Sequence, residues 1–136
     1  MKTMISALLL TLILIACQKE EIILPEGNAE LIGSWINPQY TDTLITYERA
    51  GNLVENQYGF TFKSGNKLIA RQNSGWCGTP PISTSDYNGT WTQNGSEIKL
   101  TMDYWGGTSI QTWKIVSLDP QKLVIFISSS KYQQSK

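Results

Sequence analysis

Apolar and polar residues alternate along much of the chain, which is the two-residue period of a strand with one buried face. Residues 97–102 place Ile98, Leu100 and Met102 on one face of such a strand. Residues 58–63 do the same with Tyr58, Phe60 and Phe62. Residues 123–127 are instead apolar at every position, so we expect their outer face to be covered as well.

Turn-forming residues divide the chain after residue 32 into short segments of this kind. The pattern predicts eight strands, near residues 33–37, 42–49, 53–63, 67–74, 88–93, 96–103, 108–118 and 122–129. Asn37-Pro38 is expected to end the first of them. Asn94-Gly95 predicts a type I′ hairpin, which needs positive φ at both central positions. The fold class is therefore all-β: an up-and-down antiparallel barrel leaves no free edge, and a two-sheet sandwich stays open as the alternative.

The first 16 residues have the form of a secretory signal peptide. Lys2 provides the positive charge, and an almost unbroken apolar run follows from Met4 to Ile15. That run is shorter than the roughly 20 residues a membrane-spanning helix needs. Leu14-Ile15-Ala16-Cys17 then resembles the lipobox of bacterial lipoproteins. The resemblance implies that Cys17 becomes the lipidated first residue of the mature protein, with the membrane as its partner.

Residues 17–28 are predicted to be the lipidated cysteine and a tether. Gln18-Lys19-Glu20-Glu21 resembles the surface-export signal of lipoproteins in one Gram-negative phylum. The resemblance implies an outer-membrane protein that faces the cell surface, and the inner face of that membrane stays the alternative. Ile22-Ile23-Leu24 is apolar for a tether and is expected to pack on the barrel or touch lipid headgroups.

The predicted barrel domain, residues 29–136, carries a glycine two positions before a tryptophan at two places: Gly33 with Trp35, and Gly89 with Trp91. A buried tryptophan covers about 150–250 Å² and needs a partner for its indole N–H. The glycine lets another chain segment approach closely. Both pairs are therefore read as structural, with ligand contact as the alternative.

Leu31-x-Gly33-x-Trp35, preceded by a predicted helical turn, resembles the Gly-x-Trp signature of lipocalins. Tyr87-Asn88-Gly89-Thr90-Trp91 is similar to a mid-domain motif of small lipocalin-like bacterial lipoproteins. The resemblance covers about residues 29–129 and implies a ligand-binding barrel closed at one end by Trp35. Lipocalins also place an arginine over this tryptophan late in the last strand, where this chain offers only Lys131.

Composition narrows the function further. Eleven basic and eleven acidic residues balance to zero net charge, which gives no basis for nucleic-acid binding. The absence of histidine removes His-dependent nucleophile pairs and the commonest metal ligand. We therefore expect no enzyme, no cofactor and no metal. Asp42, Asp86 and Asp103 lie beside predicted turns, where Asp is favoured for local hydrogen bonds rather than for paired-carboxylate catalysis.

Residues 73–82 form the longest predicted loop, at one rim of the barrel, and long ordered loops often carry function. Trp76 in this loop is interpreted either as a lid over a cavity or as a plug in the barrel end. Cys77 beside it is read as a buried thiol or a link between two chains. Tyr104-Trp105 places two aromatics at a hairpin tip, where they either stack on a partner or fold back on the turn.

Two functions follow. The first is binding of a small hydrophobic or amphipathic ligand inside the barrel. The second is a barrel filled by its own side chains that uses its rim loops for protein or glycan contacts. An eight-stranded barrel is just wide enough for either. The candidate ligand-binding residues are Tyr47, Tyr58, Phe60, Phe62, Trp76, Ile98, Leu100 and Met102.

Overall fold

The computed structural model describes residues 30–75 and 79–136. The predicted signal peptide, Cys17 and the tether lie outside these ranges, as do Trp76 and Cys77. No helix in the described ranges has the length and apolar character needed to cross a membrane.

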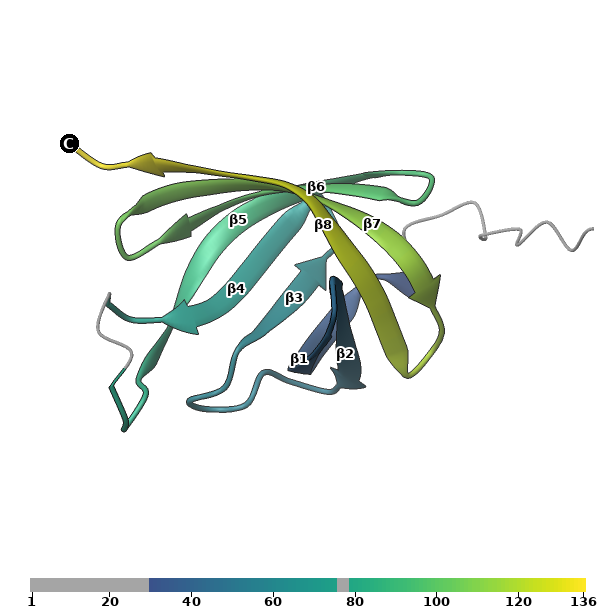
Figure 1. The fold of residues 1–136 in the computed structure, drawn as a ribbon, viewed down its shortest axis with the longest axis horizontal. Coiled ribbons are helices and arrows are strands. Elements are labelled where there is room, and N and C mark those ends of the chain that lie inside the picture. Colours follow the sequence, from purple (N-terminus) through teal and green to yellow (C-terminus); the bar gives the residue numbers. More distant parts are fainter. Residues whose placement is uncertain (1–29, 76–78) are drawn as a thin grey trace, which may run out of the picture.

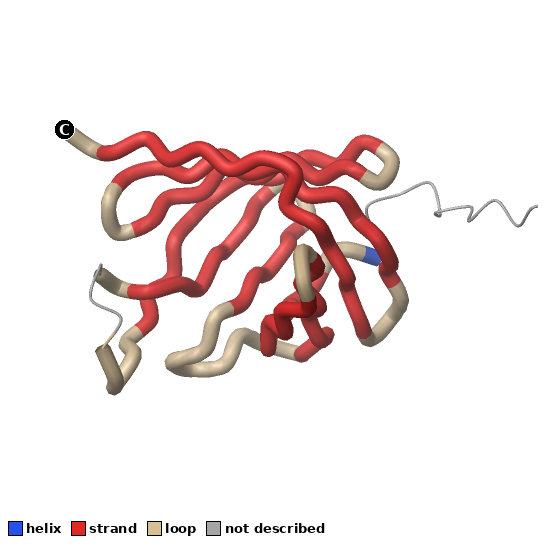
Figure 2. The backbone as a smooth tube through the Cα atoms, viewed as in Figure 1, coloured by secondary structure: helices blue, strands red, loops and turns tan. Residues whose placement is uncertain are grey.

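Eight antiparallel strands close into a barrel (Figure 1), which confirms the predicted fold class and removes the sandwich alternative. Almost all of the tube in Figure 2 is strand, apart from the connections and a short helical turn at Glu30. The strands are β1 (Gly33–Thr41), β2 (Leu44–Ala50), β3 (Gly59–Lys63), β4 (Lys67–Asn73), β5 (Thr84–Asn94), β6 (Glu97–Tyr104), β7 (Gly107–Leu118) and β8 (Lys122–Gln134).

The order of strands around the barrel departs from a simple meander at one place. The order is β1-β2-β8-β7-β6-β5-β4-β3, and β3 pairs with β1 to close the ring. β1 therefore lies between β2 and β3. The connection from β2 to β3, residues 51–58, has to cross the end of β1. From β3 to β8 each strand pairs with the next, as in an up-and-down barrel.

Several predicted strand ends were wrong, and β1 shows why. Asn37-Pro38 does not end this strand: the register shifts between Ile36 and Gln39, and β1 continues to Thr41. Asn37 takes a φ of 54° in this bulge, a conformation that Asn tolerates, and a proline without an N–H fits where the ladder is interrupted. The turn to β2 is Asp42-Thr43 instead.

Other strands also begin at positions that differ from the predicted ones, some later and some earlier in the chain. β3 begins at Gly59 rather than near residue 53, because residues 53–58 form turns, with Asn56 at a φ of 56°. β5 begins at Thr84 and therefore includes Asp86, which is not beside a turn. The predicted hairpin between β5 and β6 is confirmed, but its loop is Gly95-Ser96 and, of these two, Gly95 alone has positive φ, so the predicted type I′ turn is wrong.

One end of the barrel is closed by Trp35, which is fully buried. Its indole N–H donates to the Leu31 carbonyl oxygen over 2.8 Å. The Arg49 guanidinium carbon lies 4.2 Å from the centroid of the Trp35 ring, and Arg49 also donates to the carbonyl oxygens of Ile32 and Glu30. The arginine over the tryptophan thus comes from β2, and Lys131 does not replace it.

Both glycines of the two Gly-x-Trp pairs permit close approaches, as predicted. A Cβ on Gly33 would lie 2.7 Å from an Arg49 guanidinium nitrogen, and one on Gly89 would lie 2.5 Å from the Thr101 carbonyl oxygen. Trp91 is buried, and its indole N–H donates to the Lys63 carbonyl oxygen over 3.0 Å. The structure therefore confirms that Trp35 and Trp91 are core residues.

The outer face of β8 differs from the expectation for residues 123–127. Leu123 and Ile125 face the core with no exposed surface, whereas Phe126 on the opposite face keeps 38% of its surface exposed. Leu44 and Lys114 are its neighbours on the two adjacent strands. Val124, on the same outer face, is half-buried, so the described residues leave this face partly exposed rather than covered as expected.

These positions predict very different costs for truncating two tryptophans. Trp35→Ala should lower the free energy of unfolding by about 3–5 kcal/mol, since it removes a fully buried ring and the base for Arg49. Trp105→Ala should change it by less than about 1 kcal/mol, because Trp105 is 51% exposed. Urea unfolding monitored by circular dichroism measures both. Equal shifts of the two midpoints would contradict this placement of the core.

Candidate functional site

The end of the barrel opposite Trp35 holds a cavity of about 530 Å³. Strands β1, β4, β6 and β8 finish at this end (Figure 1). Asn73 at the end of β4 and the aromatics at the tip of the β6–β7 hairpin line the cavity, so the described parts of the loop between β4 and β5 lie at this rim. We call this space the mouth cavity. Its lining residues are Pro38, Tyr40, Ile45, Tyr47, Tyr58, Phe60, Arg71, Gln72, Asn73, Tyr104, Trp105, Gln111, Trp113, Ile127 and Tyr132.

Trp113 forms the inner boundary of the mouth cavity. Its ring is 1% exposed, stacks against Tyr47 at a centroid separation of 6.0 Å and meets the edge of Phe60 at 5.0 Å. Trp113 also meets Phe62 at a centroid separation of 6.2 Å, and Phe62 packs edge-on against Trp91. Because these rings and Trp35 belong to one buried hydrophobic cluster, the barrel is filled between Trp113 and Trp35 and open beyond Trp113.

The outer rim of the mouth cavity is aromatic and solvent-exposed. Tyr40 is 70% exposed, Tyr132 64% and Trp105 51%. Tyr104 lies between two of them, with ring centroids 5.8 Å from Trp105 and 5.6 Å from Tyr132. The aromatics of the β6–β7 tip therefore pack against the end of β8 at the cavity entrance, with faces still open to solvent.

The polar groups in the cavity wall differ in how they are bonded. The Tyr58 hydroxyl donates to Asn73 Oδ1 over 2.6 Å. Gln111 accepts from the Trp113 indole N–H over 2.8 Å and donates to Ser109 Oγ over 3.3 Å. Gln72 approaches the Met102 sulfur at 3.3 Å. Within the described residues, Tyr47 is the buried lining residue whose polar group has no hydrogen-bond partner.

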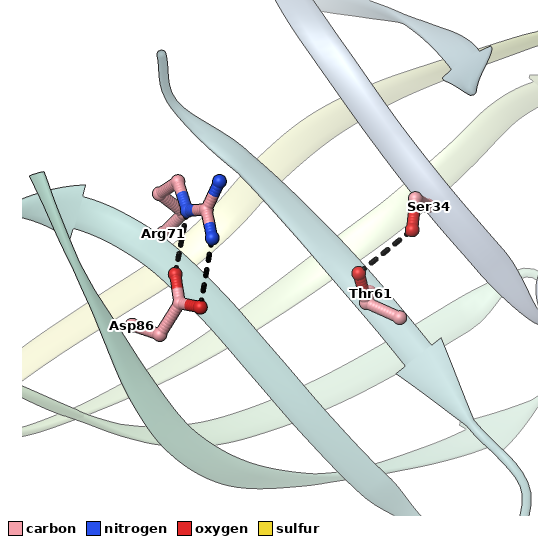
Figure 3. Close-up of polar contacts among 4 residues, drawn as sticks. All are labelled: Ser34, Thr61, Arg71 and Asp86. Atoms are coloured by element: carbon pink, nitrogen blue, oxygen red, sulfur yellow. Dashed lines mark hydrogen bonds and ion pairs between the residues drawn. The ribbon is translucent and has the colours of Figure 1, made fainter. Parts of the chain in front are cut away.

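Arg71 is the charged residue among the described lining residues, and its charge is already paired. It alternates with the buried Ala70 on β4, and its guanidinium contacts both Asp86 carboxylate oxygens, at 2.6 and 2.9 Å (Figure 3). That hydrogen-bonded contact lowers the pKa of Asp86 below its usual value. The mouth cavity therefore presents no unpaired charge to a ligand.

A second hollow, of about 610 Å³, lies on the outer surface of the barrel and is more open to solvent. Arg71 and Asp86 border it, as do Ser34 and Thr61, whose hydroxyls lie 2.8 Å apart (Figure 3). These polar groups satisfy one another, and the side chains come from the outward face of the strands. This groove is less suited to enclose a small molecule than the mouth cavity is.

The structure separates the predicted ligand-binding residues into two groups. Tyr47, Tyr58 and Phe60 line the mouth cavity. Four others are buried in the filled part of the barrel and are not among the lining residues: Phe62, Ile98, Leu100 and Met102. Trp76 lies outside the described residues. Sequence reasoning missed Tyr40, because the Asn37-Pro38 bulge was read as a turn, and it missed Trp113 as the cavity boundary.

Within residues 30–75 and 79–136, no group of three or more His, Cys, Asp or Glu side chains is placed to hold a metal ion. The described wall of the mouth cavity presents aromatic faces, a few amide groups and tyrosine hydroxyls.

Comparison with known families places the chain beside one of them. The model of the lipocalin-like domain family matches residues 31–125, which run from the start of the closed end into β8. No curated protein and no solved structure matches the chain.

Proposed function

Because the chain belongs to the lipocalin-like domain family, we propose that it binds a small hydrophobic or amphipathic molecule in the mouth cavity. Domains of this family are typically binding proteins rather than enzymes. The same fold can enclose a ligand or be filled by its own side chains, so the proposal depends on the interior of this particular barrel.

The observation that carries the proposal is the division of the interior at Trp113. A cavity of about 530 Å³ lies within the roughly 300–1,000 Å³ usual for small-molecule sites. Its inner wall is preformed, since Tyr47, Phe60 and Trp113 are held by ring contacts with one another. A preformed apolar wall limits the entropy lost on binding, and this favours affinity for a small ligand.

A second candidate function is contact with a protein or a glycan through the rim. It is favoured by the exposed aromatic faces of Tyr40, Trp105 and Tyr132 at the entrance. Such residues are enriched at recognition surfaces because they provide a large apolar area with few rotatable bonds. This candidate would leave the cavity itself empty of ligand.

We further propose that the barrel is held at the outer membrane by lipid on Cys17 and faces the cell surface. The lipobox-like Leu14-Ile15-Ala16-Cys17 and the acidic residues after it support this location. The described chain also enters the barrel at the closed end, through Glu30 and Leu31 beside Arg49 and Trp35. An anchor that precedes Glu30 would leave the mouth cavity at the far end, accessible to the medium.

Ligand binding predicts saturable uptake of a neutral fluorescent probe. Phenylnaphthylamine should bind the purified full chain with roughly micromolar affinity and brighten as it leaves water. Ile127→Trp, which enlarges a partly buried lining residue, should abolish uptake because the new ring occupies the cavity.

The matched control is Ile98→Phe, in the filled part of the barrel, where Ile98 has no exposed surface. It should retain uptake but cost about 1–3 kcal/mol of stability through overpacking. Absence of saturable uptake by the unmodified chain would remove the ligand-binding proposal and leave the rim-contact function.

Lipid anchoring predicts a defect in processing. Cys17→Ala should leave the precursor uncleaved and unlabelled by radioactive fatty acid, since the acceptor thiol is gone. Replacing Lys19, Glu20 and Glu21 together with Ala should keep the label but protect the protein from protease added to intact cells. Normal labelling of Cys17→Ala would refute the anchor, and unchanged protease sensitivity of the triple variant would refute the surface location.

A further inference from the structure

Tyr47 is a buried polar side chain at the inner wall of the mouth cavity. It projects inward from β2, is 4% exposed, and its ring is fixed by two neighbours. Trp113 stacks on it with an interplanar angle of 13°, and Phe60 meets it nearly at right angles, at 81°. Because both sides of the ring are held, the direction of its hydroxyl is set before any ligand arrives.

The Tyr47 hydroxyl has no hydrogen-bond partner within the described residues, although its neighbours in the wall do. Burial raises the pKa of this hydroxyl above its usual value, and the nearby Tyr40 phenol adds to the effect. The group is therefore a neutral O–H that can both donate and accept. Tyr47 and the exposed rim residue Tyr40 line the same mouth cavity.

The Tyr47 hydroxyl oxygen is not among the fully enclosed side-chain atoms that lack a partner, so it opens onto the mouth cavity, where water or a ligand can bond to it. An apolar ligand that displaces this water leaves the hydroxyl without a hydrogen bond, which is unfavourable. A ligand with a polar group in reach of Tyr47 replaces the lost bond. The rest of the wall constrains this ligand in two ways. Among the described residues, eight of the fifteen that line the cavity are aromatic, which suits a flat ring, and Arg71, the charged one among them, is bound to Asp86.

We propose that the mouth cavity selects a neutral, flat, ring-containing molecule that carries a hydroxyl, carbonyl or ether oxygen, and that this oxygen pairs with the Tyr47 hydroxyl. This rests on the proposed ligand-binding function and specifies its ligand class. A carboxylate or an ammonium group is disfavoured, because entering the cavity removes its hydration and no opposite charge replaces it. The cavity is thus expected both to favour ligands with an aromatic ring and to exclude ligands with a charged group.

Three probes of similar shape test the selectivity: naphthalene, naphthol and naphthoate. Each is titrated against phenylnaphthylamine bound to the full chain at neutral pH, where naphthol is uncharged and naphthoate is an anion. Naphthol should bind about three- to tenfold more tightly than naphthalene, which is the contribution of one additional hydrogen bond. Naphthoate should bind more weakly than either.

The same titrations on Tyr47→Phe assign the effect to the hydroxyl. This variant keeps the ring between Trp113 and Phe60, and its urea midpoint should not fall, because the deleted hydroxyl has no partner in the free protein. The preference for naphthol over naphthalene should disappear, while naphthalene binding stays the same. Tyr58→Phe is the matched control, since the Tyr58 hydroxyl already donates to Asn73, and it should keep the preference.

The outcomes distinguish the proposed role of Tyr47 from the proposed ligand binding itself. Failure of all three probes to displace phenylnaphthylamine overturns the proposed function itself. Displacement with an unchanged naphthol preference in Tyr47→Phe overturns only the role of Tyr47. Tightest binding by naphthoate to the unmodified chain overturns the selection against charge, and this result does not depend on whether any variant folds.

Discussion

The packing of Trp113 determines what this barrel can do. Its buried ring contacts Tyr47, Phe60 and Phe62. Its indole N–H is satisfied by Gln111 from the same strand, so the ring is fixed without a partner from the opposite wall. Trp113 belongs to the buried hydrophobic cluster that includes Trp35, and it also lines the mouth cavity, where the barrel is open.

The closed end of the barrel holds a tightly bonded core. Trp35 is bonded to Leu31 and covered by Arg49, which also binds two carbonyl oxygens of the entering chain. The Trp91 indole N–H donates to the Lys63 carbonyl oxygen, which links β5 to β3 on the two sides of β4. Trp35 and Trp91 are buried, whereas the mouth has the exposed aromatic residues Tyr40, Trp105 and Tyr132. The closed core and the proposed binding site thus lie at opposite ends of one barrel.

Short-range patterns predicted much of this structure and failed at identifiable points. Alternation found the inward faces of β3 and β6, and the two glycines marked the two tryptophans that close the core. The same alternation could not tell which inward residues fill the barrel and which line a cavity, so Ile98 and Tyr58 looked equivalent. Arg49 was not anticipated over Trp35, since its contact depends on how β2 passes the entering chain. The Asn37 bulge hid Tyr40, because a bulge and a turn use the same residues.

The interior of the barrel is open beyond Trp113 and filled before it. A crystal of the full chain soaked with bromonaphthalene tests this division directly, because the bromine is located by its anomalous signal without reference to side-chain positions. We expect one strong bromine peak in the mouth cavity, against Tyr47, Phe60 and Trp113. Bromine only in the outer groove beside Arg71 and Asp86, or side chains collapsed across the mouth with no bromine inside, would contradict it.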